Sequence, residues 1–188
     1  MIVLKTERLI IRDHEAGDLQ AMHGLLSDDT TMYYMQDIRT GTLEESEANL
    51  QAAMDEALSP DRQKYFFKIM DRRDRRYIGE IGFTVELDTP FGKIVHLGYF
   101  ILPEFWGRGI VAEAAGEVFR FAFEDAGAIK IETGCIKENS RSERVMEKLG
   151  MIKEAEYRMH VWHDGRLKDR VEYRLTRDEW ERMKETSE

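Results

Sequence analysis

The order strand, helix, strand between residues 95 and 136 constrains the fold more than any other feature of this chain. Val95–Leu102 and Ile129–Ile136 are rich in β-branched and aromatic residues, which is typical of strands. The stretch between them, from about Arg108 to Ala126, carries apolar residues at helical spacing, and Gly127 marks its end. Because a helical crossover joins parallel neighbours, the sequence predicts a sheet with at least one parallel pair.

The other elements predict mostly antiparallel partners for that pair. Further strands are expected at 9–11, 65–70, 77–87, 154–162 and 168–175, the last two joined by a turn at Asp164-Gly165. One helix starts near Asp18, and capping pairs predict the start of three more: Thr42 with Glu45, Ser140 with Glu143, and Thr176 with Glu179. The expected fold class is α/β (mixed α+β), with about seven strands flanked by helices. No linker or repeat interrupts it, so a single domain over residues 1–188 is expected.

Composition excludes several classes of partner and cofactor. The net charge of −9 argues against a nucleic-acid partner, because that binding needs a basic face. No apolar run approaches the length of about 20 residues that a membrane-spanning helix needs, so no membrane partner is expected. Cys135 is the single cysteine and allows no internal disulfide, which indicates a cytoplasmic protein. The histidines do not form a metal-ligand spacing with cysteine, so no metal is predicted.

A turn suited to phosphate precedes the long helix. Pro103 ends the strand, and Gly107-Arg108-Gly109 then opens the helix. The glycines let the backbone approach a ligand closely, while the helix start offers unpaired N–H groups and the positive end of the helix dipole. The turn therefore predicts an anion site for phosphates, although Gly-x-Gly at a helix start can also be only a tight turn.

Two other phosphate-binding motifs do not account for this turn. The chain lacks the Lys-Ser or Lys-Thr that ends a P-loop. The spacing Gly107-x-Gly109-x-x-Ala112 partly matches a dinucleotide fingerprint, but in that motif the first glycine follows the strand directly, and here residues 103–106 intervene. That fold also requires repeated parallel units, whereas most strands here predict antiparallel pairing. We therefore exclude dinucleotide binding.

The residues around the turn resemble the GNAT superfamily of N-acetyltransferases. The resemblance is carried by LGYFILPEFWGRG at 97–109 and by NSRSERVMEKLGM at 139–151. With TERLIIR at 6–12, these motifs are similar to the branch that contains the ribosomal-protein alanine N-acetyltransferases (RimJ/RimL-like). The resemblance covers nearly the whole chain. It implies the GNAT fold, splayed between the fourth and fifth strands, and acetyl-CoA as the acetyl donor.

The resemblance also implies the residues that bind the donor. Acetyl-CoA would lie in a V-shaped opening between the strands 95–102 and 129–136, with pantetheine bonded by Asn139 and its sulfur near Ser142. The main chain of three residues would bond the pantetheine arm and polarise the thioester carbonyl: Phe100, Ile101 and Leu102. The pyrophosphate would be held at the turn by Trp106, Gly107, Arg108, Gly109, Ile110, Val111 and Ala112, with backbone N–H groups from Gly107 onward.

Two positions depart from the superfamily pattern. Val111 ends the pyrophosphate motif where glycine or alanine is usual, and its side chain is bulkier. Met146 stands where many members carry the tyrosine that protonates the leaving thiolate, and methionine cannot donate a proton. Ser142 is therefore the candidate acid, directly or through water. Capping of the helix that starts at Ser140 is the alternative interpretation of Ser142.

Glu80 and His96 are the candidates for the general base that deprotonates the acceptor amine. Glu80 lies in the predicted strand 77–87, where flanking glycines leave room for a ligand, and a solvent-facing strand residue is the alternative. His96 stands where the resembling branch often has a carboxylate. Imidazole is a suitable base near neutral pH, and a structural role is the alternative.

The predicted function is transfer of the acetyl group of acetyl-CoA to a primary amine by direct attack in a ternary complex. The acceptor is a protein N-terminus or a small amine, and a non-catalytic acyl-CoA-binding module is the alternative. Three tyrosines are candidates for the acceptor pocket, with core packing as the other interpretation: Tyr33, Tyr34 and Tyr99. The sequence leaves open whether the protein is a monomer or a homodimer.

Overall fold

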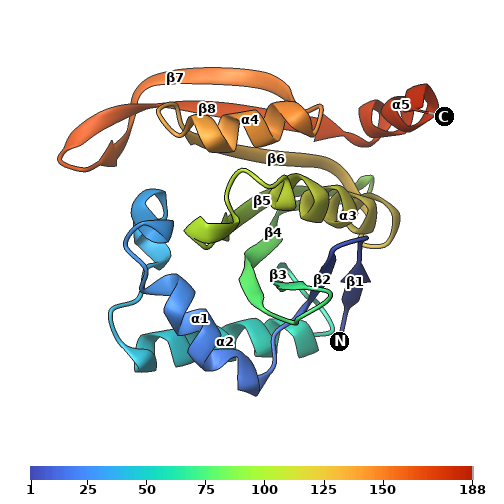
Figure 1. Cartoon of the computed structure of the whole chain (residues 1–188). Coiled ribbons are helices and arrows are strands. Elements are labelled where there is room, and N and C mark those ends of the chain that lie inside the picture. The colour runs from blue at the N-terminus through green and yellow to red at the C-terminus, as the bar shows by residue number, and fades with distance from the viewer. Residues whose placement is uncertain (188) are drawn as a thin grey trace. The chain divides into compact units, whose positions relative to one another are not determined.

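The computed structural model describes residues 1–187, and its elements follow the predicted order (Figure 1). The strands are β1 (Val3–Lys5), β2 (Leu9–Asp13), β3 (Lys64–Asp71), β4 (Tyr77–Thr89), β5 (Gly92–Ile101), β6 (Ala128–Ile136), β7 (Ile152–His163) and β8 (Arg166–Thr176). The α-helices are α1 (Leu19–Leu26), α2 (Leu43–Leu58), α3 (Ile110–Glu124), α4 (Ser140–Lys148) and α5 (Arg177–Ser187). Short 3-10 helices are η1 (Ala16–Asp18), η2 (Thr31–Tyr34), η3 (Gln36–Ile38) and η4 (Pro103–Phe105).

The strands form one mixed sheet in the order β1-β2-β3-β4-β5-β6-β8-β7. β5 and β6 are parallel, as the helix between them requires, and the neighbours β1–β2, β2–β3, β3–β4, β6–β8 and β7–β8 are antiparallel. The predicted fold class is confirmed. Within residues 1–187 the sheet has eight strands where about seven were expected, because the short strand β1 gave no recognisable pattern in the sequence.

The parallel pair is joined along only part of its length. In the described residues its register runs from Lys93, opposite Ala128, to His96, opposite Glu132. β5 nevertheless continues to Ile101, and β6 continues to Ile136. The register therefore involves the first part of β5, up to His96.

The chain forms two compact units. The first unit comprises Met1–Thr84 and Gly98–Val118, and the second comprises Val85–Leu97 and the described residues from Phe119 to 187. In the first unit α1 and α2 lie against each other (Figure 1). Their shared apolar core consists of Met22, Leu25, Leu26, Met32 and Leu50, with Tyr77, Phe100 and Leu102 among the partly buried residues packed against it.

The second unit contains the long β7–β8 hairpin, orange in Figure 1. Its turn has positive φ at both central residues, 51° at Asp164 and 73° at Gly165, which matches the right-handed twist of the strands. The predicted hairpin turn is therefore confirmed. Facing aromatic rings join α5 to α3, with the centroids of Trp180 and Phe123 separated by 5.1 Å.

The capping predictions were right for two helices and wrong for a third. Thr42 with Glu45 forms the reciprocal capping box of α2, and Thr176 exchanges hydrogen bonds with Glu179 at the start of α5. Before α4, however, the cap is Asn139, whose Oδ1 accepts a hydrogen bond from Ser142 N at 3.3 Å. Asparagine is among the best N-caps, and here it precedes the serine that the sequence suggested.

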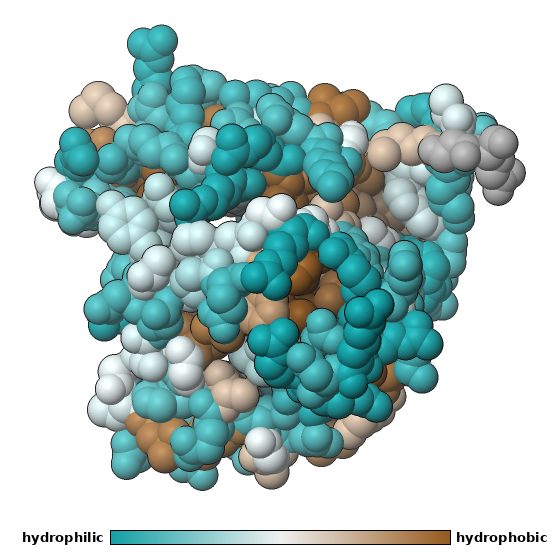
Figure 2. Space-filling view, viewed as in Figure 1, coloured by the Kyte–Doolittle hydropathy of each residue, from teal (hydrophilic) through white to brown (hydrophobic). Residues whose placement is uncertain are grey.

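The face of the molecule in Figure 2 is largely hydrophilic, with small apolar areas between the teal residues. This distribution agrees with a charged content of 35%. Among residues 1–187, none of the helices combines the length and the apolarity that crossing a bilayer requires.

Candidate active site

The turn before α3 has a backbone shape that favours glycine. Gly107 and Gly109 have φ values of 72° and 73°, in the left-handed region that residues with a Cβ rarely adopt. A Cβ on Gly107 would meet nothing within 4 Å, so conformation and not crowding requires glycine there. Because α3 begins at Ile110, the amides of its first turn have no acceptor inside the helix. The turn therefore fits a phosphate group.

Contacts within the first unit hold this turn in place. Trp106 Nε1 donates to Ile101 O at 2.9 Å, which ties the turn to the end of β5. Arg8 Nη1 donates to Arg108 O at 3.1 Å, and Arg8 Nε forms an ion pair of 2.6 Å with Glu113 on α3. Donors fixed in this way need little rearrangement when an anion binds.

The bulk of Val111 lies away from solvent. Its side chain is buried, so its methyl groups pack in the interior and leave the exposed side of the turn open. Arg108 is exposed and stacks on Phe105, with 5.7 Å between its guanidinium carbon and the ring centroid. The departure from glycine or alanine at position 111 is therefore compatible with an anion at the turn.

The backbone N–H groups of the three residues predicted to contact pantetheine at the end of β5 differ in direction. Leu102 N donates to Ile78 O at 2.9 Å, so this amide is used between β5 and β4. Successive N–H groups of a strand point to opposite sides, and the amide of Ile101 therefore points away from β4. Of Phe100, Ile101 and Leu102, Ile101 is therefore the residue whose N–H is not directed at β4.

Glu80 lies on β4 beside this end of β5. A Cβ added to Gly79 would overlap Phe100 O and the Cα of Ile101, and one added to Gly82 would overlap Tyr65 O. The expectation that these glycines leave room for a ligand was wrong, because neighbouring backbone fills that space. The side chain of Glu80 is only 13% exposed, so Glu80 is not a solvent-facing strand residue either.

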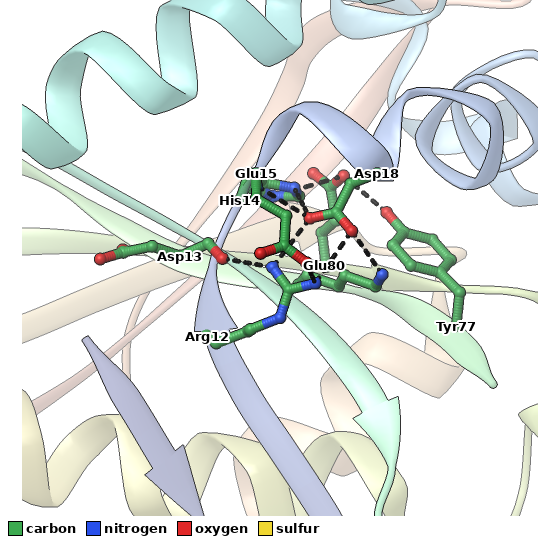
Figure 3. A network of polar contacts seen from close by, with 8 residues as sticks. Arg12, Asp13, His14, Glu15, Asp18, Tyr77 and Glu80 are labelled. Atoms are coloured by element: carbon green, nitrogen blue, oxygen red, sulfur yellow. Dashed lines mark hydrogen bonds and ion pairs between the residues drawn. The ribbon is translucent and has the colours of Figure 1, made fainter. Parts of the chain in front are cut away.

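Glu80 belongs to a buried polar network built from β2, η1, β3 and β4 (Figure 3). Tyr77 Oη donates to Glu80 Oε1 at 2.7 Å, and His14 Nε2 lies 3.7 Å from the same oxygen. Asp18 forms ion pairs with Arg12, at 2.9 Å, and with Lys68, at 2.6 Å. Figure 3 shows the side chains of His14, Asp18 and Glu80 pointing toward one another.

This environment shifts the pKa values of Glu80 and Asp18 in opposite directions. Burial raises the pKa of Glu80 from 4.5 to about 7, against the hydrogen bond from Tyr77, and the negative charge of Asp18 adds to the rise. Burial would also raise the pKa of Asp18, but hydrogen bonds from Arg12 and Lys68 hold it below its usual value. Near neutral pH, Asp18 is therefore charged, and Glu80 can both take and release a proton.

Sequence reasoning identified Glu80 but missed its partners. Lys68 lies directly across from Glu80 in the β3–β4 register, yet it reaches Asp18, 50 positions earlier in the chain. His14 and Tyr77 carried no local motif. Lys68 could have been identified as a neighbour of Glu80 only from the correct register of β3 with β4. No sequence pattern placed His14 near Glu80.

The other base candidate, His96, lies in the second unit. It is half-buried on β5 and stands opposite Glu132 of β6 in the parallel register. His96 therefore belongs to the stretch where the main chains of β5 and β6 are paired. Glu80, in contrast, lies beside the part of β5 that extends beyond that pairing.

The tyrosines proposed for the acceptor separate into two groups within the first unit. Tyr33 and Tyr34 lie on η2 with ring centroids 4.8 Å apart and planes at 80°, and Tyr33 is 42% exposed. Tyr99 precedes Phe100, which packs against the α1–α2 core, so alternation along β5 turns Tyr99 to the opposite face. Tyr33 and Tyr34 are therefore adjacent, while Tyr99 faces elsewhere.

The acid candidate lies near the start of α4 in the second unit. Ser142 uses its backbone N–H in the cap with Asn139, which leaves its half-buried hydroxyl for other contacts. One of these is the thiol of Cys135. Met146 has no exposed surface, so the position that carries tyrosine in many members is here part of the core.

The thiol of Cys135 is expected to be unreactive in the folded protein. Burial raises its pKa to about 11, so almost no thiolate exists at neutral pH. A disulfide reagent at about pH 8 should label Cys135 at least about a hundredfold more slowly in the native protein than in denaturant. Rapid labelling of native protein, followed by absorbance, would contradict this burial.

Comparisons with known proteins agree with this architecture. The family model described as an acetyltransferase (GNAT) domain matches residues 8–152. A Bacillus subtilis (strain 168) protein named uncharacterized N-acetyltransferase YoaA is 26% identical over 175 residues, which cover 93% of this chain and 97% of that protein. The ribosomal protein uS5-alanine N-acetyltransferase of Escherichia coli (strain K12) is 26% identical over 116 residues, 62% of this chain and 59% of that protein.

A solved structure shares the fold at lower identity. The spermidine N-acetyltransferase from Vibrio cholerae, in complex with CoA and spermine, superposes with a TM-score of 0.80 at 19% identity and covers 93% of this chain and 99% of that one. The match of the family model extends over most of the sequence and includes the turn before α3, Glu80 and the start of α4. The chain therefore belongs to the GNAT family of N-acetyltransferases.

Proposed function

We propose that this protein transfers the acetyl group of acetyl-CoA to a primary amine by direct attack in a ternary complex, with Glu80 as general base. The observation that carries the proposal is a buried carboxyl group with a pKa of about 7, on the strand β4 that is hydrogen-bonded to the residue following β5. A base works best when its pKa lies near the working pH, because it must both accept and release a proton. A solvated glutamate would be a weaker base.

The donor residues fit acetyl-CoA. The amides from Gly107 to Ala112, with Arg108 beside them, would hold the pyrophosphate at the start of α3. The amide of Ile101 would polarise the acyl carbonyl, and Asn139 and Ser142 remain the proposed contacts to pantetheine. Bound acetyl-CoA supplies an activated thioester, so the protein needs no nucleophile of its own. The family match over residues 8–152 supports the proposal of a single N-acetyltransferase domain.

A primary amine is the proposed acceptor class. The related E. coli enzyme is named for an alanine of ribosomal protein uS5, and the V. cholerae structure holds spermine, so amines of both sizes occur among proteins of this fold. The exposed ring of Tyr33, edge-on to Tyr34, offers an aromatic surface to an ammonium group. Glu80 adds a negative charge when it is ionised.

Ser142→Ala is expected to lower kcat about tenfold while the affinity for acetyl-CoA changes little. In the absence of a tyrosine at position 146, the Ser142 hydroxyl is the proposed proton donor to the leaving thiolate, and that thiolate is already a good leaving group. Ser140→Ala, which removes an exposed hydroxyl two residues earlier, is the matched control. Steady-state thiol release at saturating acetyl-CoA measures the effect. Full turnover by Ser142→Ala would show that the acid assignment is wrong.

The decisive experiment is thiol release from acetyl-CoA with a panel of amines, paired with mass spectrometry of acetylated products. The panel contains peptides with free N-terminal alanine or serine, polyamines, aminoglycosides and amino acids. Release that depends on one acceptor, with a product heavier by one acetyl group, supports the proposal. Binding of acetyl-CoA without thiol release for any amine would favour the alternative, a non-catalytic acyl-CoA-binding module. Met146, which is buried and cannot donate a proton, is compatible with that alternative.

A further inference from the structure

His14 is buried at the centre of the polar network without a hydrogen bond to either ring nitrogen. Its side chain has no exposed surface, and among residues 1–187 neither Nδ1 nor Nε2 has a hydrogen-bond partner. Nδ1 lies 3.8 Å from Asp18 Oδ2, and Nε2 lies 3.7 Å from Glu80 Oε1. A buried polar group in this state is costly, whereas phenylalanine would fill the same space without that cost.

Burial keeps His14 neutral. Burial lowers its pKa from 6.5 to about 4; the nearby negative charges of Asp18 and Asp13 act against this, and the positive charges of Arg12 and Lys68 act with it. A neutral imidazole has one N–H donor and one nitrogen with a lone pair. His14 can therefore donate to one of its two carboxyl neighbours, but not to both.

Asp18 decides which ring nitrogen carries the hydrogen. Its ion pairs with Arg12 and Lys68 keep it charged at neutral pH, so it remains an acceptor at all times. The N–H of His14 is then most stable on Nδ1, which faces Asp18. The lone pair on Nε2 consequently faces Glu80, where it repels a carboxylate and accepts a hydrogen bond from a protonated carboxyl group.

We propose that His14 is a positioning residue for Glu80: its Nδ1–H is directed at Asp18, and its Nε2 accepts a hydrogen bond from Glu80 when that carboxyl group is protonated. The inference rests on the proposed role of Glu80 as base. When Glu80 takes a proton from the acceptor ammonium, an N–H bond breaks and an O–H bond forms on the carboxyl group. That O–H turns toward His14 Nε2 while Tyr77 continues to donate to Oε1, and the proton leaves to solvent before the next turnover.

Nitrogen NMR of the wild-type protein tests the tautomer without any acceptor. With ¹⁵N-labelled histidine, His14 should have a protonated Nδ1 and an unprotonated Nε2 from about pH 6 to about pH 8. The Nε2 shift should move as Glu80 loses its proton, with a midpoint near 7, the value to which burial raises the pKa of Glu80. In Glu80→Gln this movement should vanish. A hydrogen on Nε2, or a charged imidazolium in this range, would overturn the proposal.

His14→Phe tests the effect on Glu80. Loss of the His14 nitrogen that accepts a hydrogen bond from protonated Glu80 should lower the titration midpoint of Glu80 by about one pH unit. The shift should be visible both in the acidic limb of the kcat/KM profile and in ¹³C NMR of the labelled carboxyl group. If His14 only filled space, the less polar phenylalanine would leave the midpoint in place or raise it, and that result would contradict our proposal. His23→Phe is the matched control, because His23 contacts Ser46 and belongs to α1.

The two readouts separate the two hypotheses. If no amine is acetylated but the carbon midpoint still falls in His14→Phe, the role of His14 stands and the proposed function fails. If acetylation occurs and the midpoint does not fall, the function stands and the role of His14 fails. Thermal melting of each variant confirms that it is folded before either result is interpreted.

Discussion

Gly109→Val is expected to weaken acetyl-CoA binding by more than about a hundredfold. Valine would have to adopt a φ near 73°, a strain of about 1–3 kcal/mol for a residue with a Cβ. Its branched side chain would also stand beside the amides that are proposed to contact the pyrophosphate. Relaxation of the strain would turn these amides away from the ligand. Isothermal titration calorimetry with CoA and acetyl-CoA measures the loss directly.

Gly127→Val is the matched control for strain alone. Gly127 lies just beyond the C-terminal end of α3, has a φ of 76°, and a Cβ there would meet nothing within 4 Å. Valine at position 127 should therefore lower thermal stability about as much as valine at position 109, while the affinity for CoA is retained. Unchanged affinity in Gly109→Val would show that this turn does not bind the coenzyme, and equal losses in both variants would indicate general destabilisation.

Glu80→Gln is expected to lower kcat about a hundredfold to a thousandfold while acetyl-CoA affinity stays the same. Glutamine keeps the size of the side chain and can still accept the hydrogen bond from Tyr77, but it cannot take a proton. In the wild type, kcat/KM should rise with pH through about 7, where Glu80 becomes charged, and the variant should lose this limb. Glu86→Gln, an exposed change on the same strand, is the matched control.

The same substitution should make the protein more stable above neutral pH. Because burial raises the pKa of Glu80 from 4.5 to about 7, the folded state holds a proton that the unfolded state releases between these values. The stability contributed by Glu80 is therefore greatest below about pH 4.5 and is lost as pH rises through about 7. At about pH 8, Glu80→Gln should raise the free energy of unfolding by up to about 3 kcal/mol.

Denaturant unfolding of the wild type and of Glu80→Gln at several pH values tests this expected gain in stability. The difference between their free energies of unfolding must be used, because buried His14 also contributes a pH dependence. Its lowered pKa removes stability as pH falls from 6.5 toward about 4. If kcat falls but stability above neutral pH does not rise, Glu80 is not the buried acid with a raised pKa described above. If stability rises and kcat is unchanged, His96→Ala becomes the next variant, because His96 is the alternative base.

Local sequence signals predicted the elements of the fold well. The crossover between residues 95 and 136, the hairpin turn at Asp164-Gly165 and the capping box at Thr42 all depend on residues close together in the chain, and all three were confirmed. The cap of α4 was wrong because two good caps, Asn139 and Ser140, are adjacent. The strand β1 was missed because it is only three residues long.

The environment of Glu80 could not be predicted in the same way. Its raised pKa arises from burial and from Asp18, a neighbour contributed by a segment far away in the sequence. The role of the glycines beside it was wrong for a related reason. Gly79 and Gly82 appeared to make space on their own strand, but the backbone that occupies this space comes from β5 and β3. Such facts follow from strand pairing, not from local composition.

The contact between Arg8 and the carbonyl of Arg108 joins positions 100 residues apart, and Thr6 donates a hydrogen bond to Glu113 on α3, the helix that follows Arg108. The loop proposed to bind the coenzyme is thus held in place by residues 6–8, which lie outside the loop sequence itself. Transplanting residues 103–112 alone into a relative would therefore move the loop without the contacts that fix its position. Chimeras of this family should exchange both segments together.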